Sequence, residues 1–329
     1  KITLTQFRPN TAEAVWTDCF AQAIAELHKA GGGVLTVPTG EYSTGPIELC
    51  SNMELHLEPG AVIRFLNDPA AFPLQECQYE GRISHRPKPC LSAFNAENVA
   101  LTGSGVLDGC GAPWWAAQRA RTLANGRPYL LHFENVTHLR VCGVQLRNSP
   151  AWTVHPLNCV DVLIEDVSIC NPYNSPNTDG INPESCRDVR ILNCRVDVGD
   201  DCITLKSGTE ETPSPVPCEN IVIANCLLVH GHGGIVIGSE MSGGVRNVTV
   251  TNCVFTGTDR GLRVKTRRRR GGCVENLRLS NLVMERVFCP FVFNMYYSCG
   301  TAEKDRWVWE KTPYPVDGGT PAFRNIRIN

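Results

Sequence analysis

A short segment with one simple pattern recurs along this chain: a polar residue, usually Asn or Asp, opens a run in which apolar and polar residues alternate. The copies begin at Asn98, His138, Asp161, Asp188, Asn220, Asn247, Asn276 and Asn325. The steps between the middle copies are 23, 27, 32, 27 and 29 residues. A period in this range indicates a solenoid, because each repeat can form one coil that buries its apolar side chains against the next.

The residues within each copy predict strands. β-branched residues alternate with polar ones, whereas leucine-rich repeats of similar period need a leucine and asparagine consensus with helical returns. We therefore expect an all-β fold, a right-handed parallel β-helix that forms a single domain over residues 1–329. The chain stops a few residues into another repeat, so we expect a longer natural protein with further C-terminal coils.

One helix is expected, over residues 12–29, where Thr11 is available as a cap and three glycines end the pattern. It would cover the open N-terminal end of the stack. Everything after it predicts short strands and turns. The segments 68–90 and 298–322, which contain Pro and Gly, are expected to form long surface loops.

The overall charge gives no reason to expect a nucleic acid or a membrane as a partner. The formal net charge is −2, from 31 basic and 33 acidic residues, so no global field favours a polyanion or an anionic surface. No apolar run approaches the roughly 20 residues needed to cross a bilayer. Attraction for a charged substrate must therefore be local.

Cysteine is abundant, with 17 residues spread along the chain. Several follow Asn inside apolar segments, where a thiol packs like a small apolar side chain, and we expect most of them to be free and to form internal ladders. That many thiols favour a reducing cytoplasm, while the Lys at position 1 leaves secretion after removal of a leader open. The pairs are Asn158-Cys159, Asn193-Cys194, Asn225-Cys226 and Asn252-Cys253.

Several chemically active side chains follow the repeat starts at similar offsets. They fall in the second half of consecutive coils, and stacking brings such positions together at about 4.8 Å per coil. One such motif by itself is more typical of an Asx turn, but joint placement on consecutive coils favours a functional site. The residues are Asp179, Asp200, Asp201, His232, Arg263 and Lys265.

This set of side chains suits hydrolysis of an anionic polysaccharide. Glycoside hydrolysis by inversion needs one protonated carboxyl as the acid and one carboxylate that activates water. Crowding of like charges raises at least one carboxyl pKa, so three acids can supply both forms. Arg263 and Lys265 lie two positions apart on one strand face and can bind a substrate carboxylate.

Four segments of the chain resemble the signature segments of glycoside hydrolase family 28, the polygalacturonases, in their usual order and approximate spacing. They are Asn177-Thr178-Asp179, Gly199-Asp200-Asp201, Gly231-His232-Gly233 and Arg263-Val264-Lys265. The resemblance covers most of the chain, and Val264 stands where Ile is more usual. It implies a hydrolase that cleaves α-1,4-galacturonosidic bonds in polygalacturonate, pectin or oligogalacturonides with inversion, and it implies no metal and no other cofactor.

The resemblance also implies a role for each catalytic residue. Asp200 would be the general acid. Asp179 and Asp201 would position and activate the attacking water. His232 would help to set the protonation of the acid.

Substrate-binding residues are implied in the same way. Arg263 and Lys265 would bind a galacturonate carboxylate on the non-reducing side of the cut. Asn177 would orient its neighbours. Tyr297 would provide an aromatic contact, with Tyr296 an equal candidate by sequence.

The segments 182–186 and 238–240 look more like the bacterial exo-acting branch, and the insertions 68–90 and 110–128 would close one end of the groove. Three alternatives stay open: a hydrolase of rhamnogalacturonan or another pectin branch, a calcium-dependent pectate lyase, and a non-catalytic β-helix that binds polysaccharide. The carboxylate cluster favours hydrolysis, because a pure binder has little reason to gather three acids beside a site for an anionic sugar.

Overall fold

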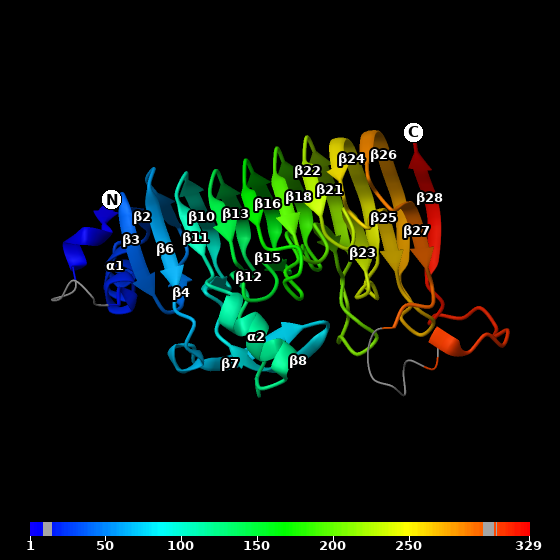
Figure 1. Cartoon of the computed structure of the whole chain (residues 1–329), viewed down its shortest axis with the longest axis horizontal. Coiled ribbons are helices and arrows are strands. Elements are labelled where there is room, and N and C mark those ends of the chain that lie inside the picture. Colours follow the sequence, from blue (N-terminus) through cyan, green and yellow to red (C-terminus); the bar gives the residue numbers. More distant parts are fainter. Residues whose placement is uncertain (9–14, 299–305, 307) are drawn as a thin grey trace.

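The computed structural model describes residues 1–8, 15–298, 306 and 308–329. Its strands stack coil upon coil into a right-handed parallel β-helix, which confirms the predicted fold (Figure 1). Three faces of parallel strands run along the stack. The third face carries the candidate site.

The first face contains β1 (Ile2–Thr3), β2 (Gly33–Val37), β5 (Met53–Leu57), β10 (Glu97–Gly103), β13 (Thr137–Cys142), β16 (Val160–Glu165), β18 (Arg187–Leu192), β21 (Cys218–Ala224), β24 (Val245–Thr256), β26 (Cys273–Glu285) and β28 (Ala322–Ile328). The second contains β3 (Gly40–Thr44), β6 (Ala61–Phe65), β11 (Val106–Asp108), β14 (Gln145–Arg147), β17 (Ser168–Cys170), β19 (Arg195–Val198) and β22 (Leu227–His230), and continues into the ends of β24 and β26. The third contains β4 (Ile47–Leu49), β9 (Leu91–Phe94), β12 (Leu131–Glu134), β15 (Val154–Leu157), β20 (Ile203–Leu205), β23 (Ile235–Gly238), β25 (Arg260–Lys265) and β27 (Cys289–Asn294).

The register between coils follows the sequence repeat. Each apolar position of one repeat lies opposite the same position of the next, and these side chains form continuous stacks in the core. One stack, with every member at most 1% exposed, consists of Leu139, Val162, Val189, Ile221, Val248 and Leu277. The repeat therefore specifies both the strands and their alignment.

The polar residue that opens each repeat turns the chain. Asn220, Asn247 and Asn276 all have φ of 57–58°, a left-handed conformation that Asn tolerates better than most residues. Their side chains also bond to one another: Asn247 Nδ2 donates to Asn220 Oδ1 and Asn276 Nδ2 donates to Asn247 Oδ1, both at 3.0 Å. These ladders satisfy the side-chain amides and hold successive coils in register.

The buried cysteines form internal ladders, as expected, at two corners of the coils. Cys159 stacks with Cys186 and belongs to the corner before the first face, whereas Cys194 and Cys226 stack with Cys253 at the next corner. All cysteines in the described part of the chain are free thiols, in agreement with the expectation.

The N-terminal helix α1 (Thr17–Lys29) covers the end of the stack, as expected, but it begins later than predicted. The Trp16 backbone N–H donates to the Ser43 carbonyl at 2.7 Å, and the Thr17 hydroxyl accepts from the Gly45 N–H at 2.7 Å, so the approach to the helix is tied to β3. The predicted cap, Thr11, lies outside the described residues. None of the helices in the described residues is long and apolar enough to cross a bilayer.

A second helix, α2 (Ala112–Ala120), was not predicted; the segment 110–128 was expected to be a loop. Tertiary contacts stabilise it: Trp114 is buried edge-on against Phe72, and Trp115 Nε1 donates to the Ser149 carbonyl at 2.9 Å. Pro113 in the first turn was the one sequence signal for it. Short 3₁₀ turns occupy Leu4–Phe7 and Pro69–Ala71.

The segment 68–90 is not an irregular loop, because it contains an antiparallel hairpin of β7 (Leu74–Tyr79) and β8 (Arg82–Pro87). The hairpin and α2 lie together beside the third face (Figure 1). Tyr79 stacks on Trp152 with ring centroids 4.8 Å apart, and Arg86 lies over the Tyr79 ring at 3.9 Å. These contacts explain why a polar surface segment is ordered here.

Asn247 tests the contribution of the amide ladder to stability. Asn247→Ala removes two hydrogen bonds and places Ala in the left-handed region, so we expect the free energy of unfolding to fall by about 2 kcal/mol in urea titrations. Asn247→Gly loses the same hydrogen bonds but tolerates the positive φ, so it should cost less. Wild-type stability of the Ala variant would refute the contribution of the ladder.

Candidate active site

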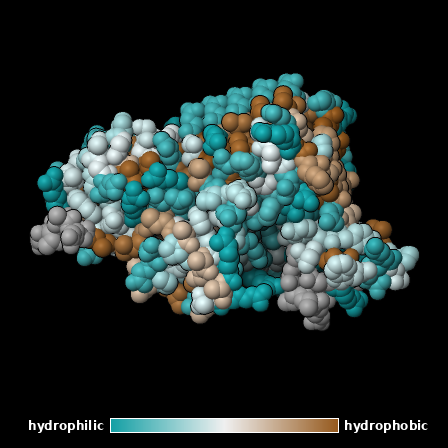
Figure 2. Space-filling model, in the orientation of Figure 1, coloured by the Kyte–Doolittle hydropathy of each residue, from teal (hydrophilic) through white to brown (hydrophobic). Residues whose placement is uncertain are grey.

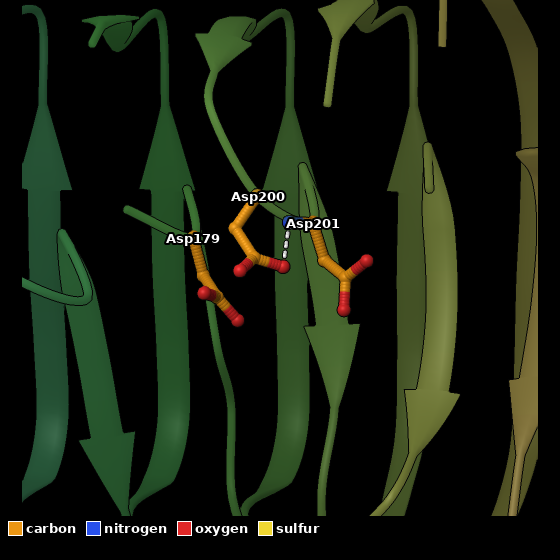
Figure 3. Close-up of side chains that lie close together, drawn as sticks. All are labelled: Asp179, Asp200 and Asp201. Atoms are coloured by element: carbon orange, nitrogen blue, oxygen red, sulfur yellow. Dashed lines mark hydrogen bonds between the residues drawn. The ribbon is translucent and has the colours of Figure 1, made fainter. Parts of the chain in front are cut away.

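Three carboxylates from two successive coils meet at the start of the third face. Asp179 precedes Ile181, which bridges both Val154 and Ile203, and Asp200 and Asp201 directly precede β20. Nearest carboxylate oxygens of the three all lie within 4.8 Å of one another. Figure 3 shows the side chains extending to the same side, with Asp200 between the other two.

Asp201 is held by two cations from β25. Arg263 Nη1 donates to Oδ1 at 3.1 Å and Lys265 Nζ donates to Oδ2 at 2.6 Å, while the Asp201 side chain is fully buried. Both cations reach one carboxylate because residues two apart on a strand share a face. The group of three carries one net positive charge when ionised.

Asp200 contacts His232 from the next coil. The His232 Nδ1 lies 3.2 Å from Asp200 Oδ1, and the Asp201 backbone N–H donates to the same oxygen at 2.9 Å. Burial acts to raise the pKa of Asp200, but the hydrogen bond and charge of His232, together with Lys265, outweigh burial and lower it. The same hydrogen bond raises the pKa of His232.

Asp179 has the opposite character. Burial, and then the charges of Asp200 and Asp201, raise its pKa well above the usual carboxyl range. Asn182 Nδ2 donates to its Oδ2 at 3.1 Å. Asp179 is therefore the carboxyl that binds a proton most readily, while Asp200 favours its ionised form beside His232, as expected for crowded carboxyls that cannot all carry charge.

The carboxylate cluster also has the oxygen donors that a hard cation prefers. However, Arg263 and Lys265 already neutralise Asp201, and Asp179 favours its protonated form. The residues present are therefore electrically balanced by protein groups, and they fit acid and base chemistry better than a metal centre.

The carboxylates open into a pocket of about 320 Å³ on the third face. Figure 2 shows this side of the molecule hollowed between the hairpin and the C-terminal segments, with mostly hydrophilic residues around the hollow. Six predicted site residues line the pocket, whereas Asp201 and Arg263 lie against the residues that line it. The six are Asn177, Asp179, Asp200, His232, Lys265 and Tyr297.

The structure separates the two tyrosine candidates. The Tyr297 ring lies 5.4 Å from the Arg263 guanidinium carbon and 5.2 Å from Lys265 Nζ, and the residue lines the pocket. Tyr296 instead bridges to Arg267 and is about half exposed. Tyr297 is therefore the aromatic residue that joins the two cations.

Asn177 is positioned by a residue that the sequence did not single out. Arg127, only 2% exposed, donates from Nη2 to Asn177 Oδ1 at 2.6 Å, and from Nη1 to the carbonyls of Pro150 and Pro176 at 2.9 and 2.6 Å. Arg127 thus clamps the turn that carries Asp179. No local sequence signal around Arg127 predicts this role.

Two further lining residues were missed, Lys206 and Glu240, which form a buried ion pair at 2.6 Å. Lys206 Nζ also lies 4.5 Å from the Trp152 ring centroid. Glu240 belongs to the segment 238–240 that pointed to exo action, so a signal for it existed, although without a chemical role.

Comparison with known proteins agrees with this geometry. Residues 35–305 match the model of glycosyl hydrolases family 28. A probable polygalacturonase of Vitis vinifera is 34% identical over 84% of the chain, which spans 58% of that relative's length. An exopolygalacturonase of Platanus acerifolia is 27% identical over 98% of the chain and 82% of its own length. The crystal structure of a hyperthermoactive exopolygalacturonase from Thermotoga maritima has a TM-score of 0.81 and 35% identity, over 90% of this chain and 76% of that one.

The opposite pKa shifts of two buried aspartates predict opposite effects of pH on stability. Asp179 favours its neutral form in the folded state, so its contribution to the free energy of unfolding is lost as pH rises. Asp179→Asn should therefore gain stability relative to wild type between about pH 4 and pH 7.

Asp108 is the control. Burial acts to raise its pKa, but Asn148, the Cys110 N–H and Arg147 outweigh burial and lower it, so its contribution is present at neutral pH and lost in acid. Asp108→Asn should therefore lose more stability at about pH 7 than at about pH 4. Urea unfolding at both pH values measures each change, and the same pH trend in both variants would contradict the assignment.

Proposed function

The chain belongs to glycosyl hydrolases family 28, and we propose that it hydrolyses α-1,4-galacturonosidic bonds of polygalacturonate or oligogalacturonides from a chain end. The observation that carries the proposal is the joint placement of three carboxylates, within 4.8 Å of one another, and two cations beside them. Similarity to exopolygalacturonases of Platanus acerifolia and Thermotoga maritima supports the same reading.

One proton shared by Asp179 and Asp200 supplies both catalytic forms. Before substrate binds, Asp179 holds it, but an anionic sugar that displaces water adds negative charge and raises the proton affinity of Asp200. Transfer to Asp200 creates the general acid for the leaving oxygen and leaves Asp179 as the base that activates water. Asp201, fixed by its two cations, helps to hold that water.

The positive charge left over from Arg263, Lys265 and Asp201 suits the carboxylate of one galacturonate. Arg263 offers a planar pair of donors, and Lys265 is a point charge only 7% exposed, so their attraction is weakly screened. The Tyr297 ring packs beside both cations and provides an apolar surface for the sugar.

Closure of the pocket supports action from a chain end. Two residues at the hairpin tip, Glu80 and Arg82, line the pocket, as does Thr209 from the loop that follows β20. The hairpin and this loop touch where Thr209 Oγ1 donates to the Gly81 carbonyl at 3.4 Å, and a Cβ at Gly81 would overlap the Thr209 side chain. A groove blocked by two joined segments accepts an end more readily than the middle of a polymer.

The test of the function is a reducing-end assay on polygalacturonate with product sizing. We expect reducing ends to appear with little loss of viscosity, and short products from the start. The proposal includes inversion, which releases the β anomer first and is read by NMR. A rapid viscosity drop with mixed oligomers would reject end-directed action, and an unsaturated product that absorbs in the ultraviolet would reject hydrolysis.

Asp200→Asn should leave the fold intact and lower kcat by about 10²–10⁴-fold, because it removes the proton donor while keeping the shape of the side chain. Circular dichroism and urea unfolding check the fold. Activity close to wild type in this variant would contradict the role of Asp200 as the acid.

His232 should control the alkaline limb of the pH profile. His232→Asn removes the partner that lowers the pKa of Asp200, so the free enzyme keeps the proton shared by Asp179 and Asp200 to higher pH, and the descending limb of kcat/KM should move upward. His230→Asn is the matched control, because His230 is equally exposed but bonds to Asp197 at 2.8 Å. A descending limb that moves to lower pH in His232→Asn, or that moves by the same amount in both variants, would contradict this assignment.

A further inference from the structure

Lys206 and Glu240 form a buried ion pair in the wall of the catalytic pocket, and the proposed catalytic steps do not use it. Lys206 Nζ donates to Glu240 Oε2 at 2.6 Å, and the residues are 4% exposed. Ser239 Oγ donates to the other oxygen of Glu240 at 2.7 Å. All three residues line the pocket.

The register of the third face places this pair in the same pocket as the catalytic carboxylates. Lys206 lies on the same coil as Asp201, and Lys206, Gly238 and Lys265 occupy one column on three successive coils. Two coil spacings separate the lysines by roughly 10 Å along the stack. Burial acts to lower the pKa of the Lys206 ammonium, but the negative charges of Glu240 and then of Asp179 outweigh burial and raise it. Asp179 therefore lies close enough to interact with Lys206.

The two lysines differ in what they can bind. Lys265 and Arg263 share one carboxylate and keep a net positive charge, whereas Lys206 is neutralised by Glu240. The carboxyls of Asp179, Glu184 and Glu80 and the guanidinium of Arg270 are the other titratable groups close to this pair. A neutral pair has little attraction for a carboxylate but still offers N–H donors and lone pairs.

Those remaining groups match sugar hydroxyls. An ammonium has three donors, of which Glu240 takes one, and a carboxylate has about four acceptor positions, of which Lys206 and Ser239 take two. A hydroxyl both donates and accepts, so it can bond to Lys206 and Glu240 together. The Trp152 ring under Lys206 holds the ammonium in place.

We infer that Lys206 and Glu240 recognise the free hydroxyl that marks the end of a galacturonate chain. An internal residue has a glycosidic oxygen at that position, which can accept from Lys206 but has no hydrogen for Glu240. A buried carboxylate facing an ether oxygen loses a hydrogen bond that water would have made, and sites of this kind discriminate strongly against an analogue without the hydroxyl. Glu240 thus selects a chain end because an internal residue, which lacks the hydroxyl hydrogen, binds more weakly.

This inference rests on the proposed function, and the experiment separates the two by measuring binding without turnover. Dissociation constants are measured by calorimetry in the Asp200→Asn background for three ligands: trigalacturonate, its analogue with a 4-deoxy non-reducing end, and its analogue with the reducing-end hydroxyl capped as the methyl glycoside. Hydrolysis of trigalacturonate by the wild-type chain is measured separately.

We expect one of the two analogues to bind at least about 100-fold more weakly than trigalacturonate, and that analogue identifies which end enters the pocket. Adding Glu240→Gln should reduce this ratio at least tenfold, because the amide can donate to an ether oxygen. Equal binding of all three ligands, or a ratio that Glu240→Gln leaves unchanged, overturns the inference whether or not the wild-type chain is active.

A second variant covers the case in which Glu240→Gln fails to fold. The double replacement Lys206→Met with Glu240→Leu removes both charges, a change that buried ion pairs often tolerate, and it should also abolish the discrimination. Glu219→Gln is the control, because Glu219 pairs with Arg246 on the first face, away from this pocket, and should keep the full ratio. Discrimination that survives in the double variant overturns the inference.

Discussion

The structure depends on one constraint, the in-register pairing of each coil with the next. Backbone hydrogen bonds fix the spacing, and the left-handed Asn corners fix the phase, as in the ladder of Asn220, Asn247 and Asn276. A slip of one residue would turn every buried side chain outward. Because the register is set along the whole stack, residues separated by more than 60 positions, such as Asp201 and Lys265, meet within hydrogen-bond distance.

The same constraint explains what the sequence could predict. Counting from repeat starts brought Asp179, Asp200 and Asp201 together with Arg263 and Lys265, because position within a repeat becomes position in space. The cysteine ladders were predictable for a related reason: Asn-Cys pairs recur at matching positions of the repeat, although the dipeptide does not say which corner of a coil each pair occupies.

Features that depart from the repeat were beyond this reasoning. Helix α2 and the β7–β8 hairpin lie outside the coils, and both are ordered by contacts with distant residues, such as Trp115 with Ser149 and Tyr79 with Trp152. Lys206 lies inside the repeat but looks like an ordinary strand residue. Only the structure shows that Glu240, from the next coil, turns it into a buried pair within the pocket.

The β7–β8 hairpin is tied to the coils through a row of hydrogen-bonded side chains: Glu184, His155, His132 and Glu134. Glu184 lies 3.1 Å from His155 Nε2, the Nδ1 atoms of His155 and His132 are 3.0 Å apart, and His132 Nε2 lies 3.4 Å from Glu134. Three contacts need three hydrogens, and two neutral imidazoles supply only two. Burial raises the pKa of Glu184 to about 7, whereas the His132 hydrogen bond lowers that of Glu134.

Glu184 is therefore the carboxyl of the two that binds a proton more readily, and a proton there lets donation run from Glu184 through His155 and His132 to Glu134. Burial lowers the pKa of His155 well below its usual value, which favours a neutral imidazole at this position. Gln78 of the hairpin donates to Glu184 Oε1 at 2.7 Å, and this bond joins the hairpin to the row of side chains. The segment that closes the pocket is thus anchored at Glu184, which lies directly opposite Lys206 of the next coil.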